Sequence, residues 1–162
     1  MKLFLPLKMI SKINYQIFTL FYIGKLPASG TFASAFTAIF YYFFYHQFTN
    51  LFIISSLIII FLYSIFFLNK TLTNFKKKDP KEIVIDEFIG QLIPLLICDG
   101  DLILISLSFF LFRFFDISKI YPASFFDKKI EGPIGIIGDD IIAGLYSLLI
   151  VYCIKLYLWK VI

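Results

Sequence analysis

Long apolar runs alternate with short polar segments along this chain, and the pattern predicts an all-α protein whose helices are mostly hydrophobic. The first two runs that we predict as membrane helices extend from Thr31 to Tyr45 and from Leu51 to Leu68. Three more follow at Phe88–Cys98, Leu102–Phe115 and Ile141–Tyr157. We therefore expect a multi-pass membrane bundle of about four to five helices, forming a single domain over residues 1–162.

The segments that flank these runs predict how the chain enters and turns. Ile13–Ile23 is apolar but too short to span a bilayer, which indicates an N-terminal interfacial helix. Gly24–Gly30 contains two glycines and a proline, so it should break that helix. Asp99–Asp101 is expected to form a tight turn, and Pro94 predicts that the helix before it is short or kinked.

The composition agrees with a membrane protein and argues against a nucleic-acid-binding one. Of the 162 residues 60% are hydrophobic and only 16% charged, and the mean hydropathy is +0.88. The net charge of +4 comes from lysines beside apolar runs, where the membrane surface is the expected partner. The first twelve residues have no signal-peptide cleavage pattern. Cys98 and Cys153 are expected to be buried small side chains rather than a disulfide.

Positive charge is distributed unevenly when the loops are assigned alternately to the two sides of a membrane. One side receives Lys2, Lys8, Lys12, Lys25, Lys70, Lys76, Lys77, Lys78, Lys81, Arg113, Lys119, Lys128 and Lys129. The other receives Asp99, Asp101, Lys155 and Lys160, together with His46, the only histidine. Since lysine and arginine are enriched on the cytoplasmic side, the first side is predicted to face the cytoplasm.

Four polar clusters fall on that predicted cytoplasmic face, each at the end of a different helix. They are Gly30–Ser34, Asp86–Glu87, Arg113–Lys119 and Asp139–Asp140. Clusters at one depth on several helices can build one shared site, and charges beside a membrane segment favour a functional one. The simpler alternatives are helix-start capping by the two acid pairs and a self-neutralising Arg113–Asp116 pair that anchors a helix end.

The residue types in these clusters suit phosphoryl chemistry on a lipid headgroup. Carboxylates such as those of Asp86–Glu87 and Asp139–Asp140 can hold Mg²⁺ together with phosphate oxygens. Arg113 and Lys119 can neutralise the rest of a phosphate. A small residue lies four positions after three of these acids, at Gly90, Ala143 and Gly144, which favours close helix packing. Glu131–Gly138 is glycine-rich, and we interpret it as a flexible re-entry turn rather than a phosphate cradle.

Four motifs in order, GTFAS at 30–34, DEFIG at 86–90, FRFFDISKIYP at 112–122 and GDDIIAG at 138–144, resemble the phosphatidylglycerophosphatase A family. The resemblance covers roughly residues 24–144. It implies a membrane enzyme that removes the terminal phosphate of phosphatidylglycerophosphate and requires Mg²⁺. It also implies a bacterial inner-membrane location, with the active site facing the cytoplasm. Ser29 and Ile120 replace prolines that the family usually has, whereas every charged motif position is kept.

Each candidate site residue then has an expected role. The metal ligands would be Asp86, Glu87, Asp139 and Asp140. The catalytic residues would be Arg113, Asp116 and Lys119, with Asp116 either a supporting residue or a nucleophile. The substrate-binding residues would be Thr31, Ser34, Arg113 and Lys119. Two rival functions are a small divalent-cation transport protein without hydrolase activity and an alcohol phosphotransferase that uses a cytidine-activated lipid. The sequence does not indicate an oligomeric state.

Overall fold

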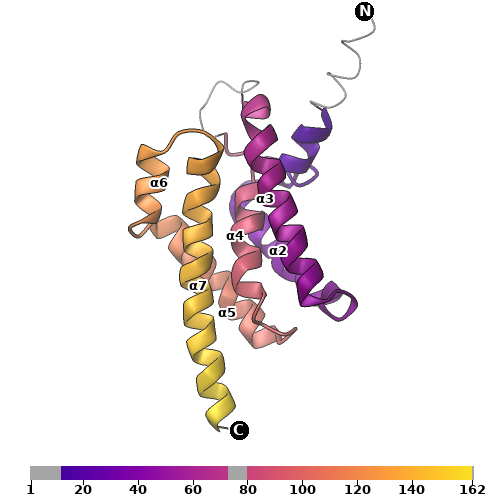
Figure 1. Cartoon of the computed structure of the whole chain (residues 1–162), viewed down its shortest axis with the longest axis vertical. Coiled ribbons are helices and arrows are strands. Elements are labelled where there is room, and N and C mark those ends of the chain that lie inside the picture. Colours follow the sequence, from indigo (N-terminus) through magenta and orange to yellow (C-terminus); the bar gives the residue numbers. More distant parts are fainter. Residues whose placement is uncertain (1–11, 73–79, 162) are drawn as a thin grey trace, which may run out of the picture.

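The computed structural model describes residues 12–72 and 80–161, and every regular element within these ranges is a helix (Figure 1). The all-α prediction is therefore confirmed for the described part of the chain. Residues 12–18 are helical, and the later elements are η1 (Ile23–Lys25), α2 (Ser29–Phe44), η2 (Tyr45–Gln47), α3 (Asn50–Leu72), α4 (Ile85–Leu95), α5 (Leu102–Ser118), α6 (Ala123–Lys129) and α7 (Pro133–Val161). Lys2, Lys8, Lys76, Lys77 and Lys78 lie outside the described ranges.

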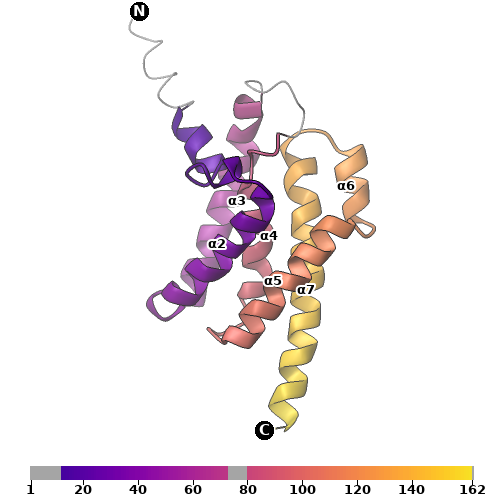
Figure 2. The same ribbon diagram turned by 180° about the vertical axis from the view of Figure 1, so that it is seen from behind.

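The short helix α4 forms the centre of the bundle. It packs against α2, α3, α5 and α7, and the two opposite views place it behind or between these longer helices (Figures 1 and 2). Nine of its eleven residues are buried. Pro94 lies in its last turn, where it removes one backbone hydrogen bond, and the helix ends at the next residue. Because α4 is enclosed by its neighbours, the side chains at its ends are held at a fixed depth in the bundle.

Within residues 12–72 and 80–161, two helices have the length and composition of a membrane span, Asn50–Leu72 and Pro133–Leu158. Large apolar side chains are also exposed over α2 and α5, among them Phe43 at 67%, Ile103 at 73% and Phe110 at 69%. Apolar side chains exposed over several helices are unfavourable in water, and together with the two long helices they indicate a membrane protein.

The end of the bundle opposite the N-terminus of α4 is closed by a second set of charges. Asp101 caps α5 by accepting the backbone N–H groups of Ile103 and Leu104 at 2.8 and 2.9 Å. The Lys155 ammonium of α7 donates to the Ile97 carbonyl at 2.9 Å and pairs with Asp99. The predicted turn at Asp99–Asp101 is confirmed, and it is tied to the lower part of α7.

Three sequence-based expectations differ from the structure. The interfacial helix ends at Phe18, because Leu20, Phe21 and Tyr22 adopt left-handed backbone angles. Glu131–Gly138 was expected to be a turn, but α7 already begins at Pro133, the favoured first helical position for proline. The last membrane helix consequently starts eight residues before Ile141.

The two cysteines were both expected to be buried. Both are free, and Cys98 is buried with its thiol donating to the Pro94 carbonyl at 3.3 Å. Cys153 is exposed on α7 instead, so the expectation is wrong for this residue. The outer surface of a membrane helix is apolar, and a small, weakly polar thiol is tolerated there as well as in the core.

Candidate functional site

The candidate site lies at the end of the bundle where α2, α4 and the polar turn before α6 meet α7. Asp86 and Glu87 occupy the first turn of α4, where the helix dipole favours negative charge. The segment before them is fixed because the Val84 backbone N–H donates to the Phe18 carbonyl at 2.9 Å. The start of α4 therefore holds both carboxylates at a defined depth.

Asp139 and Asp140 lie about two turns inside α7, not at its start as the sequence suggested. The extra turns exist because two glycines allow the helix to pass close to its neighbours. A Cβ on Gly135 would lie 1.9 Å from the Ile130 carbonyl oxygen, and one on Gly138 would lie 2.4 Å from the Phe126 ring. The glycines that predicted a turn thus permit a helix in a crowded position.

Three of the four predicted metal ligands come together between α4 and α7. One carboxylate oxygen from each of Asp86, Glu87 and Asp140 lies within 4.8 Å of the other two. Asp86 and Asp140 are only 8% and 3% exposed. The Glu87 Oε2 atom is buried without a hydrogen-bond partner among the described residues. Asp86 and Asp140 are buried and Glu87 is half-buried, and three carboxylates at this spacing repel one another unless a cation or protons lie between them.

Close contact between two helix backbones produces this spacing, as the small residues predicted. A Cβ on Gly144 of α7 would lie 2.4 Å from the Gly90 carbonyl oxygen of α4. A Cβ on Gly90 would in turn lie 2.7 Å from the Asp140 carbonyl oxygen. Only residues without side chains allow helices to approach this closely, so the glycine pair brings Asp86 and Asp140 to one point.

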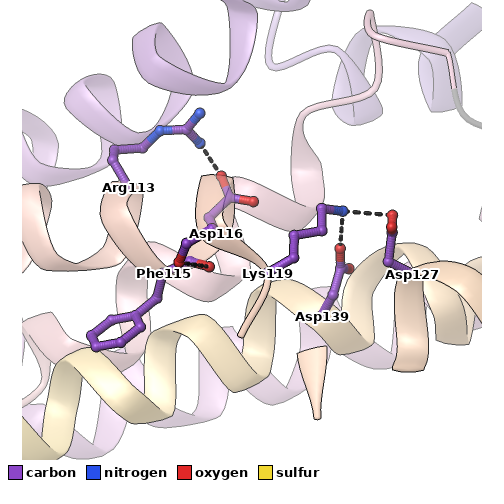
Figure 3. Close-up of polar contacts among 7 residues, drawn as sticks. Arg113, Phe115, Asp116, Lys119, Asp127 and Asp139 are labelled. Atoms are coloured by element: carbon purple, nitrogen blue, oxygen red, sulfur yellow. Dashed lines mark hydrogen bonds and ion pairs between the residues drawn. The ribbon is translucent and has the colours of Figure 1, made fainter. Parts of the chain in front are cut away.

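Arg113 of α5 lies beside the carboxylates and is held by Asp116. Its Nη1 atom forms an ion pair with the Asp116 carboxylate (Figure 3), and both side chains are largely buried, at 15% and 13% exposed. The Nε–H group of Arg113 has no partner among the described residues. Gly30 of α2 completes this corner, because a Cβ there would lie 2.2 Å from Glu87 Oε1 and 3.0 Å from Arg113 Nη1.

Arg113, Asp116 and Lys119 are three residues apart, a spacing that would place them on one face of a helix, but Lys119 lies just beyond the end of α5. It caps α5 in the left-handed conformation, with φ of 45°. This turn directs its ammonium toward α6 and α7, where it donates to Asp127 at 2.6 Å and to Asp139 at 2.5 Å (Figure 3). Left-handed backbone at a residue other than glycine is sparsely populated, and it concentrates at functional sites.

The two carboxylates around Lys119 set its charge. Burial lowers the pKa of the ammonium, but the hydrogen bonds to Asp127 and Asp139 outweigh burial and raise the pKa above its usual value. Lys119 is thus a cation throughout the physiological pH range. Asp139 is correspondingly engaged by Lys119, whereas Asp86, Glu87 and Asp140 form the three-carboxylate group.

The two hydroxyl residues predicted to bind substrate differ in their surroundings. Ser34 is buried, and its hydroxyl donates to the Gly30 carbonyl of its own helix at 2.8 Å. Its donor is therefore already used within α2. Thr31 lies in the first turns of α2 and is exposed, so only this hydroxyl is open to a ligand.

Asp127 and Gly30 are the parts of the site whose roles sequence reasoning missed. Asp127 precedes Lys128 and Lys129, and this order alone indicates a solvated helix rather than a partner for Lys119. Gly30 belongs to a motif that was noted for its hydroxyls. The partner of Lys119 could have been predicted, because Asp127 is the one acid between Lys119 and Glu131 in the sequence.

Comparison with known proteins places these residues in a family context. A family model described as Phosphatidylglycerophosphatase A matches residues 16–155. The chain is 36% identical over 99 residues to a Haemophilus influenzae protein named phosphatidylglycerophosphatase A, covering 60% of this chain and 61% of that protein. It is 40% identical over 77 residues to the Escherichia coli protein of the same name, covering 47% and 45%.

A Bacteroides thetaiotaomicron protein, whose name marks it as a proposed phosphatidylinositol-3-phosphatase, is 32% identical over 103 residues, or 60% of this chain and 62% of that protein. The matches thus span less than two thirds of the length of each of these three relatives. No solved structure matches the chain. The family model, in contrast, extends over most of the chain and includes all four clusters of the site. The chain belongs to the phosphatidylglycerophosphatase A family.

Proposed function

We propose that the chain is a lipid phosphatase that hydrolyses phosphatidylglycerophosphate to phosphatidylglycerol and inorganic phosphate. The observation that carries this proposal is the group of three carboxylates, two buried and one half-buried, near two cations, Arg113 and Lys119. In the reaction the bond between the terminal phosphorus and the glycerol oxygen breaks. Water supplies the oxygen that enters phosphate, and the glycerol hydroxyl leaves with a proton. Two relatives carry the name of this activity.

The three carboxylates fit a divalent cation, which we propose to be Mg²⁺ held by Asp86, Glu87 and Asp140. Their donors are all oxygen atoms, which Mg²⁺ prefers, and the Glu87 Oε2 atom has no partner among the described residues. Asp139 lies beside them but is bound to Lys119, so we place it at the edge of the metal site. When bound, the ion would polarise a phosphate oxygen and offset the charge of the acids.

Arg113 and Lys119 approach the group from α5 and supply the positive charge that a phosphate needs. The unused Nε–H of Arg113 can donate to a phosphate oxygen, while Nη1 stays on Asp116. Lys119 contributes a fixed ammonium held by two carboxylates. Exposed Thr31 can donate its hydroxyl to the headgroup. These groups bind and orient the phosphate where its negative charge increases during the reaction.

Of the two roles left open for Asp116, we favour the supporting one. Its Oδ2 atom is paired with Arg113, and an ion pair with a cation makes a carboxylate a weaker nucleophile. Single-turnover reactions quenched with acid are therefore expected to yield no phosphorylated Asp116. Recovery of a phospho-aspartyl peptide at residue 116 would assign it the nucleophilic role instead.

We also propose that α2, α3, α5 and α7 cross a bacterial inner membrane around α4, with the site at the cytoplasmic face. The lysines near this end of the bundle, such as Lys25, Lys81 and Lys128, support this orientation. The rival function of cation transport is not favoured, because the named relatives are phosphatases. No observation supports the alcohol phosphotransferase.

Phosphate release from purified protein tests the function directly. We expect release from phosphatidylglycerophosphate in the presence of Mg²⁺ and none after EDTA treatment, with recovery when Mg²⁺ is restored. Phosphatidic acid, phosphatidylinositol 3-phosphate and a soluble phosphate monoester should be poor substrates. Release from all of them would keep a phosphatase but remove the proposed substrate. Folded protein that releases phosphate from none would contradict the proposal.

Metal binding can be measured without turnover. Mn²⁺ has the same ligand preference as Mg²⁺ and a paramagnetic spectrum, so protein should reduce the signal of free Mn²⁺, and Mg²⁺ should restore it. Glu87→Gln should weaken this binding by about 10-fold or more, since it removes one of three ligands. Unchanged binding in that variant would place the ion elsewhere.

Asp127→Asn tests whether Lys119 must be held from both sides. The variant leaves the ammonium on Asp139 alone, and we expect kcat/KM to fall by about 3- to 10-fold because the phosphate-binding cation is less well positioned. Asp127→Glu keeps the carboxylate and should recover most of the activity. If the two variants behave alike, the Lys119–Asp127 contact has no functional role.

A further inference from the structure

An apolar groove of about 290 Å³ runs along the outer surface between α2 and α5 (Figure 2 labels both helices). Its walls include Ala35, Ala38 and Tyr42 from α2 and Ser106, Phe109 and Phe110 from α5. The Ser106 hydroxyl donates to the Leu102 carbonyl at 2.8 Å, so it presents no free donor to the groove. The groove can therefore hold a hydrocarbon but has little to offer a polar ligand.

Helical spacing connects this groove to the candidate site. Ala35 lies four residues after Thr31 on α2, and Phe109 lies four residues before Arg113 on α5. Residues four apart lie on one face of a helix. The two helices also meet at the upper end, where a Cβ on Gly30 would lie 3.0 Å from Arg113 Nη1. The groove thus leads from the lipid-facing surface toward two groups that we assign to substrate.

We propose that this groove holds one acyl chain of the phospholipid whose phosphate binds at Arg113; the proposal rests on the proposed function. The charged end of the lipid would lie at Arg113, and its hydrocarbon would lie between Ala35 and Phe109. From Ala35 to Tyr42 the groove extends about 10 Å along α2, at 1.5 Å per residue. It therefore receives the part of the chain nearest the headgroup.

The groove would position the bound lipid, and it would gain little binding free energy from removing the acyl chain from water. A lipid tail is already in hydrocarbon, so burying it against apolar side chains adds little binding free energy. Fixing the tail does, however, limit how the headgroup can move at Arg113. Misplacement of a reacting group by 1 Å can cost on the order of 100-fold in rate, so a filled groove should slow a lipid whose tail reaches the obstruction.

Ser106→Phe tests the proposal, with Ser55→Phe as a matched control. Both serines are exposed helical residues whose hydroxyls donate to a carbonyl of their own helix, but Ser55 lies on α3, away from the groove. Ser106 lies seven residues before Arg113, or about 10 Å along α5. We expect Ser106→Phe to lower kcat/KM about 10-fold or more for a dipalmitoyl substrate but not for its deacylated counterpart, which has no acyl chain to enter the groove.

Ser55→Phe should change neither rate. Equal losses on both substrates for Ser106→Phe, or no loss on either in folded protein, would overturn the proposal. Ala35→Phe narrows the groove from the other wall and should likewise slow only the acylated substrate if Ser106→Phe does not fold. Wild-type protein that hydrolyses neither substrate contradicts the proposed function and leaves the groove to a second measurement.

That measurement is photolabelling, which needs no turnover. Phosphatidylglycerophosphate with a diazirine in one acyl chain should label peptides of α2 and α5 around Ala35 and Phe109, and Ser106→Phe should reduce the labelling. Phosphatidylcholine carrying the same diazirine should label them weakly. Equal labelling by both lipids would mean that bulk lipid fills the groove. A crosslink between two chains, or labelling elsewhere, would also overturn the assignment.

Discussion

Asp140→Asn is expected to reduce phosphate release from phosphatidylglycerophosphate by at least about 100-fold. Loss of a residue that merely supports a metal ligand already costs about 10- to 100-fold, and Asp140 supplies one of the three converging oxygens itself. Asparagine has the same shape, so the contact between α4 and α7 should persist. Because one of three mutually repelling charges is removed, the thermal unfolding temperature should stay the same or rise.

Asp99→Asn is the matched control for this variant. Asp99 lies at the opposite end of the bundle, is exposed, and has a φ of 48°, a conformation that asparagine adopts readily. Its ion pair with Lys155 is partly exposed and should contribute little to stability. Initial rates at equal protein concentration should separate the two variants. Full activity in Asp140→Asn would contradict the assignment of the site.

Gly144→Ala is expected to lower both stability and activity. The added Cβ would lie 2.4 Å from the Gly90 carbonyl oxygen, so the atoms that must move belong to the backbone of α4. Overpacking typically costs about 1–3 kcal/mol, and the higher helix propensity of alanine offsets about 1 kcal/mol of it. We expect a net loss of about 1–2 kcal/mol because α4 is enclosed by four helices and cannot move freely.

The loss of activity in Gly144→Ala should exceed what the loss of stability alone would cause. Separating α4 from α7 widens the spacing between Asp86 and Asp140, so Mn²⁺ affinity should fall even in fully folded protein. Leu145→Ala, at a neighbouring position that is 48% exposed, is the control and should retain metal binding. A Gly144→Ala protein with wild-type stability and rate would show that the contact between the helix backbones is not required.

The sequence predicted the helices best where hydrophobicity alone defines them. The run Thr31–Tyr45 corresponds to α2 at Ser29–Phe44, and Leu51–Leu68 lies within α3 at Asn50–Leu72. Asp86 and Glu87 were correctly placed at the start of their helix, although α4 begins at Ile85 and not at Phe88. The close approach of α4 and α7 also followed from spacing, because a glycine lies one turn after an acid on each helix.

The remaining features depend on contacts between segments that are distant in sequence. The early start of α7 was missed because Gly135 and Gly138 indicate a turn when only the local sequence is considered. In the structure they are helical, and the absence of a Cβ allows Ile130 and Phe126 to pack against them. The direction of Lys119 follows from one left-handed residue, which helical spacing does not reveal. Its partner Asp127 lies on a separate helix of seven residues.

The tie between Lys155 and the turn before α5 sets the distance between the charged groups at the two ends of the bundle. Asp140 and Lys155 are fifteen residues apart on α7, or about 22 Å at 1.5 Å per residue, whereas the hydrocarbon core of a bilayer is about 30 Å thick. A bilayer thins around a protein whose charged ends lie closer together than the thickness of the hydrocarbon core. Lipids next to this bundle would then have their headgroups drawn inward, toward the depth of the carboxylates. The membrane itself would thus bring a phosphate close to the site, and activity should decline as the acyl chains of the surrounding lipid are lengthened.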